Sequence, residues 1–178
     1  MKGIVFTEFI EMIESEFSMK MADDIIIKSN LESGGVYTSI GTYDHTEIFA
    51  LVEQLSLATG IPTVELFRVY GQHLFSRFKS RYPKLFEKIT DSLSFLELVD
   101  SYIHKEVLKL YPKAQLPSFI TERHSENELT MIYSSKREMS DFAHGLILGC
   151  FKNFNETVEM DVDKINESKV IFKIKRLK

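Results

Sequence analysis

LTMIYSSKR, residues 129–137, is the stretch that most constrains the fold and chemistry of this chain. Its first five residues form the alternating, aromatic and β-branched run that is typical of a β-strand. Alternate side chains of a strand share a face, so Tyr133, Ser135 and Arg137 project together if strand geometry persists to Arg137. Two hydroxyls and a guanidinium fork suit a paired carboxylate or a phosphate. On spacing alone, a strand end with a solvated arginine remains the simpler interpretation.

The second half of the chain predicts a small antiparallel sheet around one helix. Short alternating runs mark the strands, and apolar residues at helical spacing mark the helix. The expected strands cover 119–122, 128–133, 157–162 and 169–175, and the expected helix covers 139–151. The turn 124–127 joins the first two strands into a hairpin.

The first half predicts helices. Phe6, Phe9 and Ile13 recur at helical spacing between glutamates. Further helices are expected at about 21–28, 46–60, 62–82 and 92–111, with a glycine-containing loop at 31–43. The order predicts an α+β fold, with a helical subdomain before an α/β subdomain that carries a small antiparallel sheet. We expect a single domain over 1–178, divided into subdomains at about 1–60 and 61–178.

Composition excludes several function classes. The 178 residues suit one globular domain, with 44% hydrophobic residues and a mean hydropathy of -0.09. The net charge of -4 argues against nucleic acid as a partner. The single cysteine, Cys150, excludes an internal disulfide and a cysteine-rich metal site. No signal peptide and no run of ~20 apolar residues is evident, so we expect a cytoplasmic protein without membrane insertion.

The spacing Tyr133-x-Ser135-x-Arg137 also carries a family resemblance. The segment resembles the propionate-binding signature of the H-NOX domain, the haem-nitric oxide/oxygen binding family. The opening MKGIVF (residues 1–6), His104 in a predicted helix and the following Pro117 are similar to further features of that family. The resemblance covers the chain from residue 1 to about 175.

The resemblance implies a site for haem b, protoporphyrin IX iron, buried between the two subdomains. It implies that His104 is the proximal iron ligand and that Tyr133, Ser135 and Arg137 hold the propionates. It also implies that Pro117 presses against the macrocycle. From the residues alone, an exposed helix histidine that pairs with Asp100 one turn earlier is the simpler interpretation of His104.

The resemblance also implies a wholly apolar distal pocket. Oxygen-binding members carry a distal tyrosine where this chain has Phe142, and phenylalanine has no hydrogen-bond donor. We therefore expect nitric oxide sensing rather than oxygen carriage. Ordinary core packing would select the same residue types. The expected distal residues are Ile4, Val5, Phe9, Leu74, Phe78, Phe142 and Leu146.

The resemblance implies a stand-alone, bacterial-type sensor and not an enzyme. The resemblance implies that nitric oxide, and also carbon monoxide, binds ferrous haem opposite His104. It implies that nitric oxide weakens or breaks the iron–histidine bond, and that the resulting shift regulates a separate histidine kinase, diguanylate cyclase or phosphodiesterase. The alternatives are an oxygen-binding haem protein, a haem peroxidase or dioxygenase, and a haem-free binding module. A haem enzyme would need a polar distal group such as His73 or His144, and we expect His73 to face away from the pocket.

Overall fold

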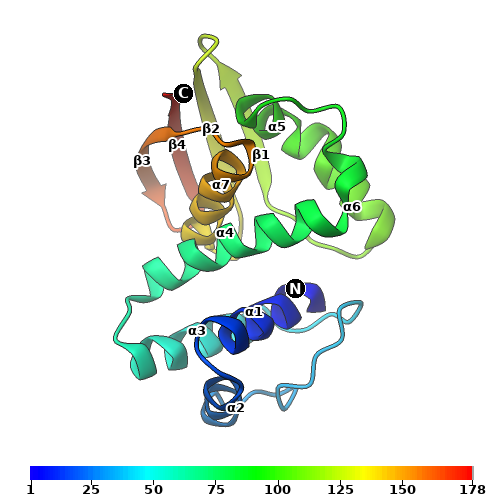
Figure 1. Ribbon diagram of the computed structural model, residues 1–178, viewed down its shortest axis with the longest axis vertical. Helices are drawn as coiled ribbons and strands as arrows, with labels where there is room; N and C mark the ends of the chain where they lie inside the picture. Colours follow the sequence, from blue (N-terminus) through cyan, green and yellow to red (C-terminus); the bar gives the residue numbers. More distant parts are fainter. Residues whose placement is uncertain (178) are drawn as a thin grey trace.

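The fold is organised around one long helix, α4. The computed structural model describes residues 1–177, and Lys178 lies outside the described residues. Helices α1, α2 and α3 lie on one side of α4, and α7, the sheet and the α5–α6 segment lie on the other (Figure 1). The helices are α1 Gly3–Glu16, α2 Met19–Lys28, α3 Thr46–Thr59, α4 Thr63–Arg81, α5 Ser92–Leu98, α6 His104–Leu110 and α7 Ser140–Phe154. The strands are β1 Ser118–Arg123, β2 Glu128–Ser134, β3 Val158–Asn166 and β4 Lys169–Arg176.

The N-terminal helices form where the apolar spacing predicts them. Phe6, Phe9 and Ile13 of α1 are each at most 1% exposed, because positions three and four apart share one face of a helix. Helix α3 ends at Gly60, whose backbone is left-handed with φ of 75°. The predicted loop at 31–43 is also present, and the chain there is neither helix nor strand.

Helices α4 and α7 cross with their backbones almost in contact. A Cβ on Gly145 would lie 2.2 Å from the carbonyl oxygen of Arg68, and one on Gly71 would lie 2.4 Å from that of Phe142. Only glycine leaves room for such an approach. The crossing therefore holds the start of α7 firmly against α4.

The sheet is antiparallel with the strand order β1-β2-β4-β3. Alternate residues of its two central strands point to the face covered by α7, and these side chains are almost fully buried. They are Leu129, Met131, Tyr133, Val170, Phe172 and Ile174. The pairing of β1 with β2 confirms the predicted hairpin, and the pairing of β3 with β4 confirms the two later strands.

The helix predicted over 92–111 is interrupted. It divides into α5, a π turn η2 over Val99–Ile103, and α6, which begins at His104. Another short element, the 3₁₀ turn η1 at Pro83–Leu85, follows α4. A π turn contains one residue more than the regular helical repeat, and such turns often mark functional positions.

Two clusters of buried residues form the core. One lies among α1, α2, α3 and α4, and the other lies among α5, α7 and the sheet. Helix α4 serves both clusters, because Leu66, Tyr70 and Leu74 belong to the first and Phe75 to the second. The subdomain division at about residue 60 stays a prediction.

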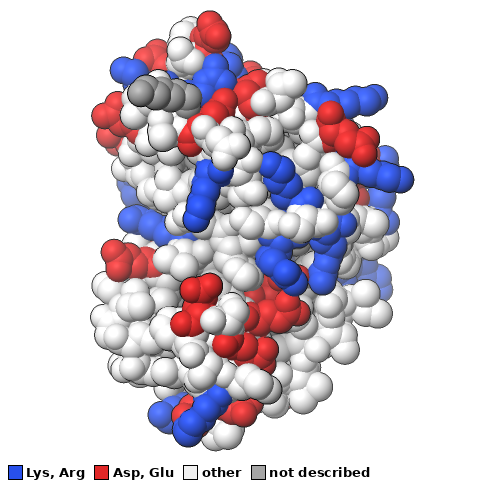
Figure 2. Space-filling model, in the orientation of Figure 1, with Lys and Arg blue, Asp and Glu red and all other residues white. Residues whose placement is uncertain are grey.

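The surface carries both charge signs. Lysine and arginine are interspersed with aspartate and glutamate over the face in Figure 2, without a continuous basic area on that face. None of the helices within residues 1–177 combines the length and apolar character that crossing a bilayer requires.

Candidate functional site

His104 begins α6 directly after the π turn. Its Nδ1 lies 3.2 Å from the Asp100 carboxylate, and its side chain is 16% exposed. The ring packs beside Phe119 of β1, with 5.8 Å between the centroids. Burial lowers the pKa of His104, so the neutral imidazole that metals bind is favoured. Within residues 1–177, Nε2 of His104 has no hydrogen-bond partner, and this nitrogen is free to act as a ligand.

The three signature residues meet at a turn and not along a strand. Strand β2 ends at Ser134, as the strand predicted over 128–133 requires, so the condition that strand geometry persists to Arg137 is not met. The backbone N–H of Ser135 donates to the carbonyl oxygen of Ser168 at 2.9 Å, and the chain then turns. The Ser135 hydroxyl accepts the Arg137 backbone N–H at 3.2 Å, which fixes that turn.

Tyr133 is the buried member of this group, at 1% exposed. Its hydroxyl oxygen accepts the backbone N–H of Met139 at 3.2 Å, and burial raises its pKa. This contact ties the end of β2 to the segment that leads into α7. Tyr133 also pairs with Phe119 across β1 and β2, with 5.5 Å between the ring centroids.

Arg137 has no carboxylate partner within the described chain. Its guanidinium donates to the backbone carbonyl of Gln115 at 2.7 Å and to the Gln115 side-chain oxygen at 3.2 Å. The residue is partly buried, and burial lowers its pKa. A partly buried cation that no carboxylate contacts directly favours an anionic ligand, although the more distant Asp44 also acts on it. Gln115 and Pro117 lie on the same segment before β1, and Pro117 is partly buried.

The expected distal residues all lie near α1, α4 and the first half of α7. Ile4, Phe9 and Leu74 are buried, at 3%, 0% and 1% exposed. The others are partly buried and pack against the first cluster: Val5, Phe78, Phe142 and Leu146. Whether they face a cofactor stays a prediction.

Tyr70 is a polar group within this apolar region. It is fully buried, and its ring lies 4.9 Å from that of Phe9 and 5.1 Å from that of Phe142. Its hydroxyl donates to the backbone carbonyl of Val5. Because the hydroxyl proton is already engaged, Tyr70 in this conformation offers no donor to a ligand.

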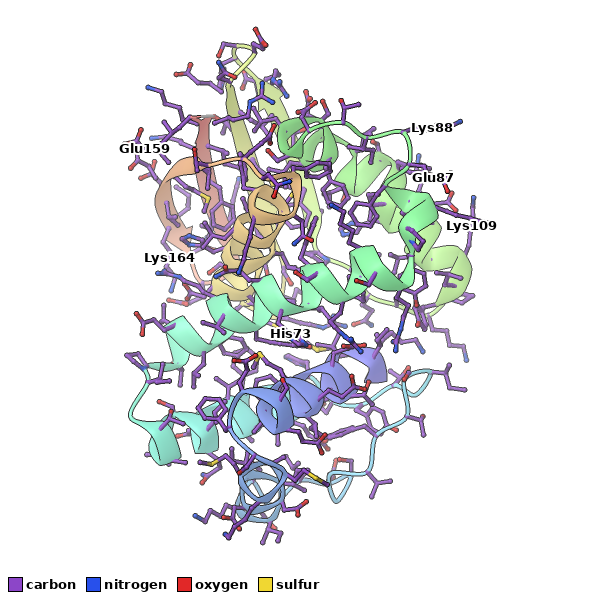
Figure 3. The ribbon with its side chains drawn as sticks, in the orientation of Figure 1. His73, Glu87, Lys88, Lys109, Glu159 and Lys164 are labelled. Atoms are coloured by element: carbon purple, nitrogen blue, oxygen red, sulfur yellow. The ribbon has the colours of Figure 1, made fainter. Side chains whose placement is uncertain are left out.

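The two candidate distal histidines have different surroundings. Figure 3 shows His73 on the side of α4 that faces α1, where Glu8 and Arg77 are among the charges that act on it. The ring of His144 packs against Phe172 of the sheet, at 6.0 Å between centroids. Burial lowers the pKa of both residues. Each has one buried ring nitrogen without a partner among residues 1–177.

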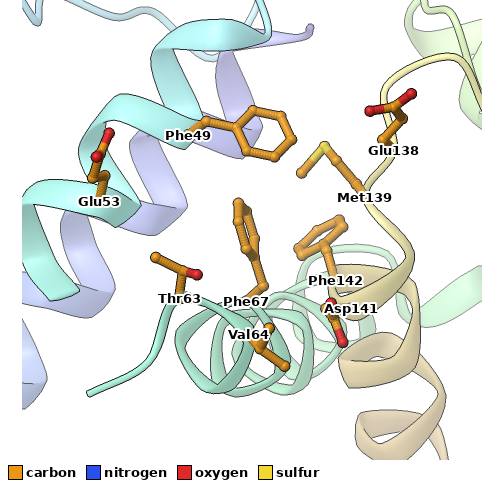
Figure 4. Close-up of a pocket in the computed structure, with 9 residues that line it drawn as sticks. All are labelled: Phe49, Glu53, Thr63, Val64, Phe67, Glu138, Met139, Asp141 and Phe142. Atoms are coloured by element: carbon orange, nitrogen blue, oxygen red, sulfur yellow. The ribbon is translucent and has the colours of Figure 1, made fainter. Parts of the chain in front are cut away.

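A cavity of about 330 Å³ opens beside Phe142, between α3 and the crossing of α4 with α7. Figure 4 shows Phe49, Phe67, Met139 and Phe142 converging on it. One side of the Phe142 ring thus borders this cavity, while Tyr70 packs against the residue within the core.

The residues fit an iron porphyrin. No group of three or more potential metal-binding side chains occurs within residues 1–177, so the described chain offers iron no complete ligand set of its own. A macrocycle would supply the remaining nitrogen ligands. The unpaired guanidinium of Arg137 suits its carboxylates, and the aromatic and aliphatic side chains suit its apolar faces.

Sequence reasoning missed Gln115 as the partner of Arg137. It weighed Asp100 only as a surface partner of His104. The four-residue spacing of Asp100 and His104 was the available signal, since such pairs meet on a helix. No sequence signal indicated Gln115, because its contact depends on how the segment before β1 folds back.

Comparison with known proteins gives consistent results. A family model described as Haem-NO-binding matches residues 2–162. No curated protein matches the chain. Among solved structures, the unliganded Fe(II) H-NOX protein from K. algicida is 42% identical, with a TM-score of 0.94, and the match covers 100% of this chain and 97% of that one.

Two further structures are similar over almost the whole chain. The IWP-051-bound H-NOX from Shewanella woodyi, in the Fe(II)CO state, is 39% identical with a TM-score of 0.85, covering 99% of this chain and 95% of that one. An H-NOX protein from S. oneidensis in the Fe(II)NO state is 25% identical with a TM-score of 0.92, covering 100% of both chains. The α+β fold expected from the sequence is confirmed by these similarities.

Proposed function

Because the chain belongs to the Haem-NO-binding (H-NOX) family, whose members are haem-based gas sensors and not enzymes, we propose that it senses nitric oxide. Haem b is the proposed cofactor. When bound, the haem would supply a ferrous iron able to bind a diatomic gas. Carbon monoxide is a second proposed ligand, since the similar S. woodyi protein is in the Fe(II)CO state.

His104 is the proposed iron ligand. Its support is the free Nε2 of a largely buried, neutral imidazole at the start of α6. Tyr133, Ser135 and Arg137 are the proposed propionate partners, with Arg137 as the charged one. Pro117 is proposed to contact the macrocycle, because it is partly buried and lies in the chain between Gln115 and β1.

The preference for nitric oxide rests on the apolar wall near Phe142. Bound oxygen gains from a nearby hydrogen-bond donor, whereas nitric oxide binds ferrous iron without one. Phe142 has no donor, and the hydroxyl of Tyr70 is engaged by the Val5 carbonyl. This engaged hydroxyl is the observation that most favours nitric oxide over oxygen.

Signal output is proposed to begin at His104. While its ring is held by iron, α6 is fixed at its first residue; when the ring is free, α6 can shift against β1 and the π turn. A partner that prefers one of the two positions would respond to the gas. We propose a separate histidine kinase, or a cyclic-di-GMP synthase or phosphodiesterase, as that partner in the cytoplasm.

Replacement of the ligand tests the proposal. His104→Gly should lose haem, and added imidazole should restore both the haem and its Soret band. His124→Gly is the matched control, because His124 is an exposed histidine whose ring nitrogens face Thr130 and Glu122. Nitric oxide should change the spectrum of the unmodified ferrous protein. Normal haem retention in His104→Gly would show that another group holds the iron.

A further inference from the structure

One oxygen of Asp100 contacts two separate parts of the fold. Oδ1 lies 3.2 Å from Nδ1 of His104 and accepts the backbone N–H of Phe119 at 3.3 Å. The first contact is within one helical segment, and the second reaches across to β1. A carboxylate can accept both bonds because each ionised oxygen has two lone pairs.

The π turn sets up this arrangement. Asp100 is inside the turn, and the His104 N–H bonds the carbonyl of Val99, five residues earlier. The extra residue in the turn places Asp100 between the ring of His104 and the start of β1. The Asp100 side chain is 49% exposed and that of His104 is 16% exposed, so the imidazole is largely removed from water and the carboxylate is not.

We propose that Asp100 is the positioning residue of the haem ligand: its carboxylate holds the His104 ring with Nδ1 as donor, leaves Nε2 for iron, and ties the ring to β1. The inference rests on the proposed role of His104. A carboxylate that accepts a bond from the outer nitrogen of a ligating histidine fixes the tautomer and raises the basicity of the inner nitrogen. Asp100 would therefore strengthen the iron–histidine bond that nitric oxide is expected to weaken or break.

The same carboxylate links His104 to the propionate-binding end of the sheet. Phe119, whose N–H bonds Asp100, pairs with Tyr133 in the register of β1 with β2. The Phe119 ring also lies against both His104 and Tyr133. Movement of the imidazole therefore strains the bond from β1 to Asp100, and β1 is the first element outside the helix to respond.

The test uses the haem-loaded ferrous full chain. Asp100→Asn keeps the side-chain shape but loses the charge, and Asp100→Ala removes the acceptor. The iron–histidine stretching frequency from resonance Raman should fall from wild type to Asp100→Asn and further to Asp100→Ala. Haem affinity should fall by up to about 10–100-fold.

Glu106→Gln is the matched control. It removes the same charge from α6 two residues after His104, but Glu106 pairs with Lys109 and does not bond the ring. Its stretching frequency should equal that of wild type.

Three outcomes separate the inference from the proposed function. A frequency that falls in the Asp100 variants and not in Glu106→Gln supports the positioning role. Equal frequencies in all four proteins overturn that role and leave His104 as the ligand. A wild-type spectrum without an iron–histidine band, or one that His104→Gly with imidazole does not alter, overturns both.

Discussion

Gly145→Ala should destabilise the protein even though alanine is the better helix former. The new Cβ would lie 2.2 Å from the Arg68 carbonyl oxygen and 2.7 Å from the Arg68 Cα, whereas ordinary contact begins at 3.4 Å. The new Cβ and the Arg68 carbonyl oxygen must therefore separate from 2.2 Å to 3.4 Å. The oxygen is a backbone atom and the Cβ is bonded directly to backbone, so neither lies at the end of a flexible side chain.

The magnitude follows from two opposing terms. Overpacking costs ~1–3 kcal/mol, and the rigid backbone on both sides places this site at the upper end. Alanine recovers about 1 kcal/mol of helix propensity relative to glycine. The net loss in the free energy of unfolding is then about 2 kcal/mol, which lowers Tm by ~4–8 °C for a domain of this size.

Urea and thermal unfolding of the haem-loaded protein measure the effect. Gly149→Ala is the matched control, because it lies in the same helix against the same partner but its Cβ would stay 2.9 Å from Gln72 Cα and Phe75 Cβ. The overpacking cost and the gain in helix propensity should nearly cancel in Gly149→Ala. A gain of about 1 kcal/mol in Gly145→Ala, as propensity alone predicts, would refute the reasoning about the crossing.

Three further predictions concern the site and its surroundings. Arg137→Ala should weaken haem binding by ~1.5–3 kcal/mol, or ~10–150-fold, in a haem titration, because it removes the charged guanidinium. Arg123→Ala is the control: it removes a guanidinium that is paired with Glu97, and it should leave haem binding unchanged. The ferrous protein in air should form no stable oxygen complex, because Phe142 has no donor; a persistent oxygen spectrum would contradict this, and Phe142→Tyr should favour oxygen only if its hydroxyl reaches the gas. Stability should also fall as the pH drops below 6.5, because burial lowers the pKa of His73 and His144 and the unfolded chain then binds protons more readily. Urea titrations at about pH 7.5 and about pH 5.5 measure this loss, which should be smaller in His144→Gln, and a midpoint that does not change with pH would contradict it.

Periodicity predicted the elements because their burial is local and regular. The spacing of Phe6, Phe9 and Ile13 can be satisfied only by one face of a helix, and α1 follows it. The hairpin of β1 and β2 is equally local. The order β1-β2-β4-β3 could not be read in this way, because alternation identifies a buried face without identifying the neighbouring strand.

The π turn and the signature turn were missed for related reasons. One extra residue at Val99–Ile103 barely disturbs a helical apolar pattern, so the segment was predicted as one continuous helix. A common face for Tyr133, Ser135 and Arg137 required strand geometry to persist to Arg137, whereas the chain leaves β2 at Ser134. The contacts of Asp100 and Gln115 depend on those departures from regular geometry, which is why the candidate site was predicted by residue type and not by its connections.

The sharing of α4 by both clusters determines how the molecule can be dissected. A fragment that begins at residue 61 would keep the sheet and α7, but it would carry an orphaned surface of Leu66, Phe67, Tyr70 and Leu74 on α4. An apolar patch of that kind promotes self-association in water. The complementary fragment 1–60 would lack α4, against which its own buried residues pack. We therefore expect neither fragment to be a transplantable module, and a domain fusion should avoid a junction near residue 60.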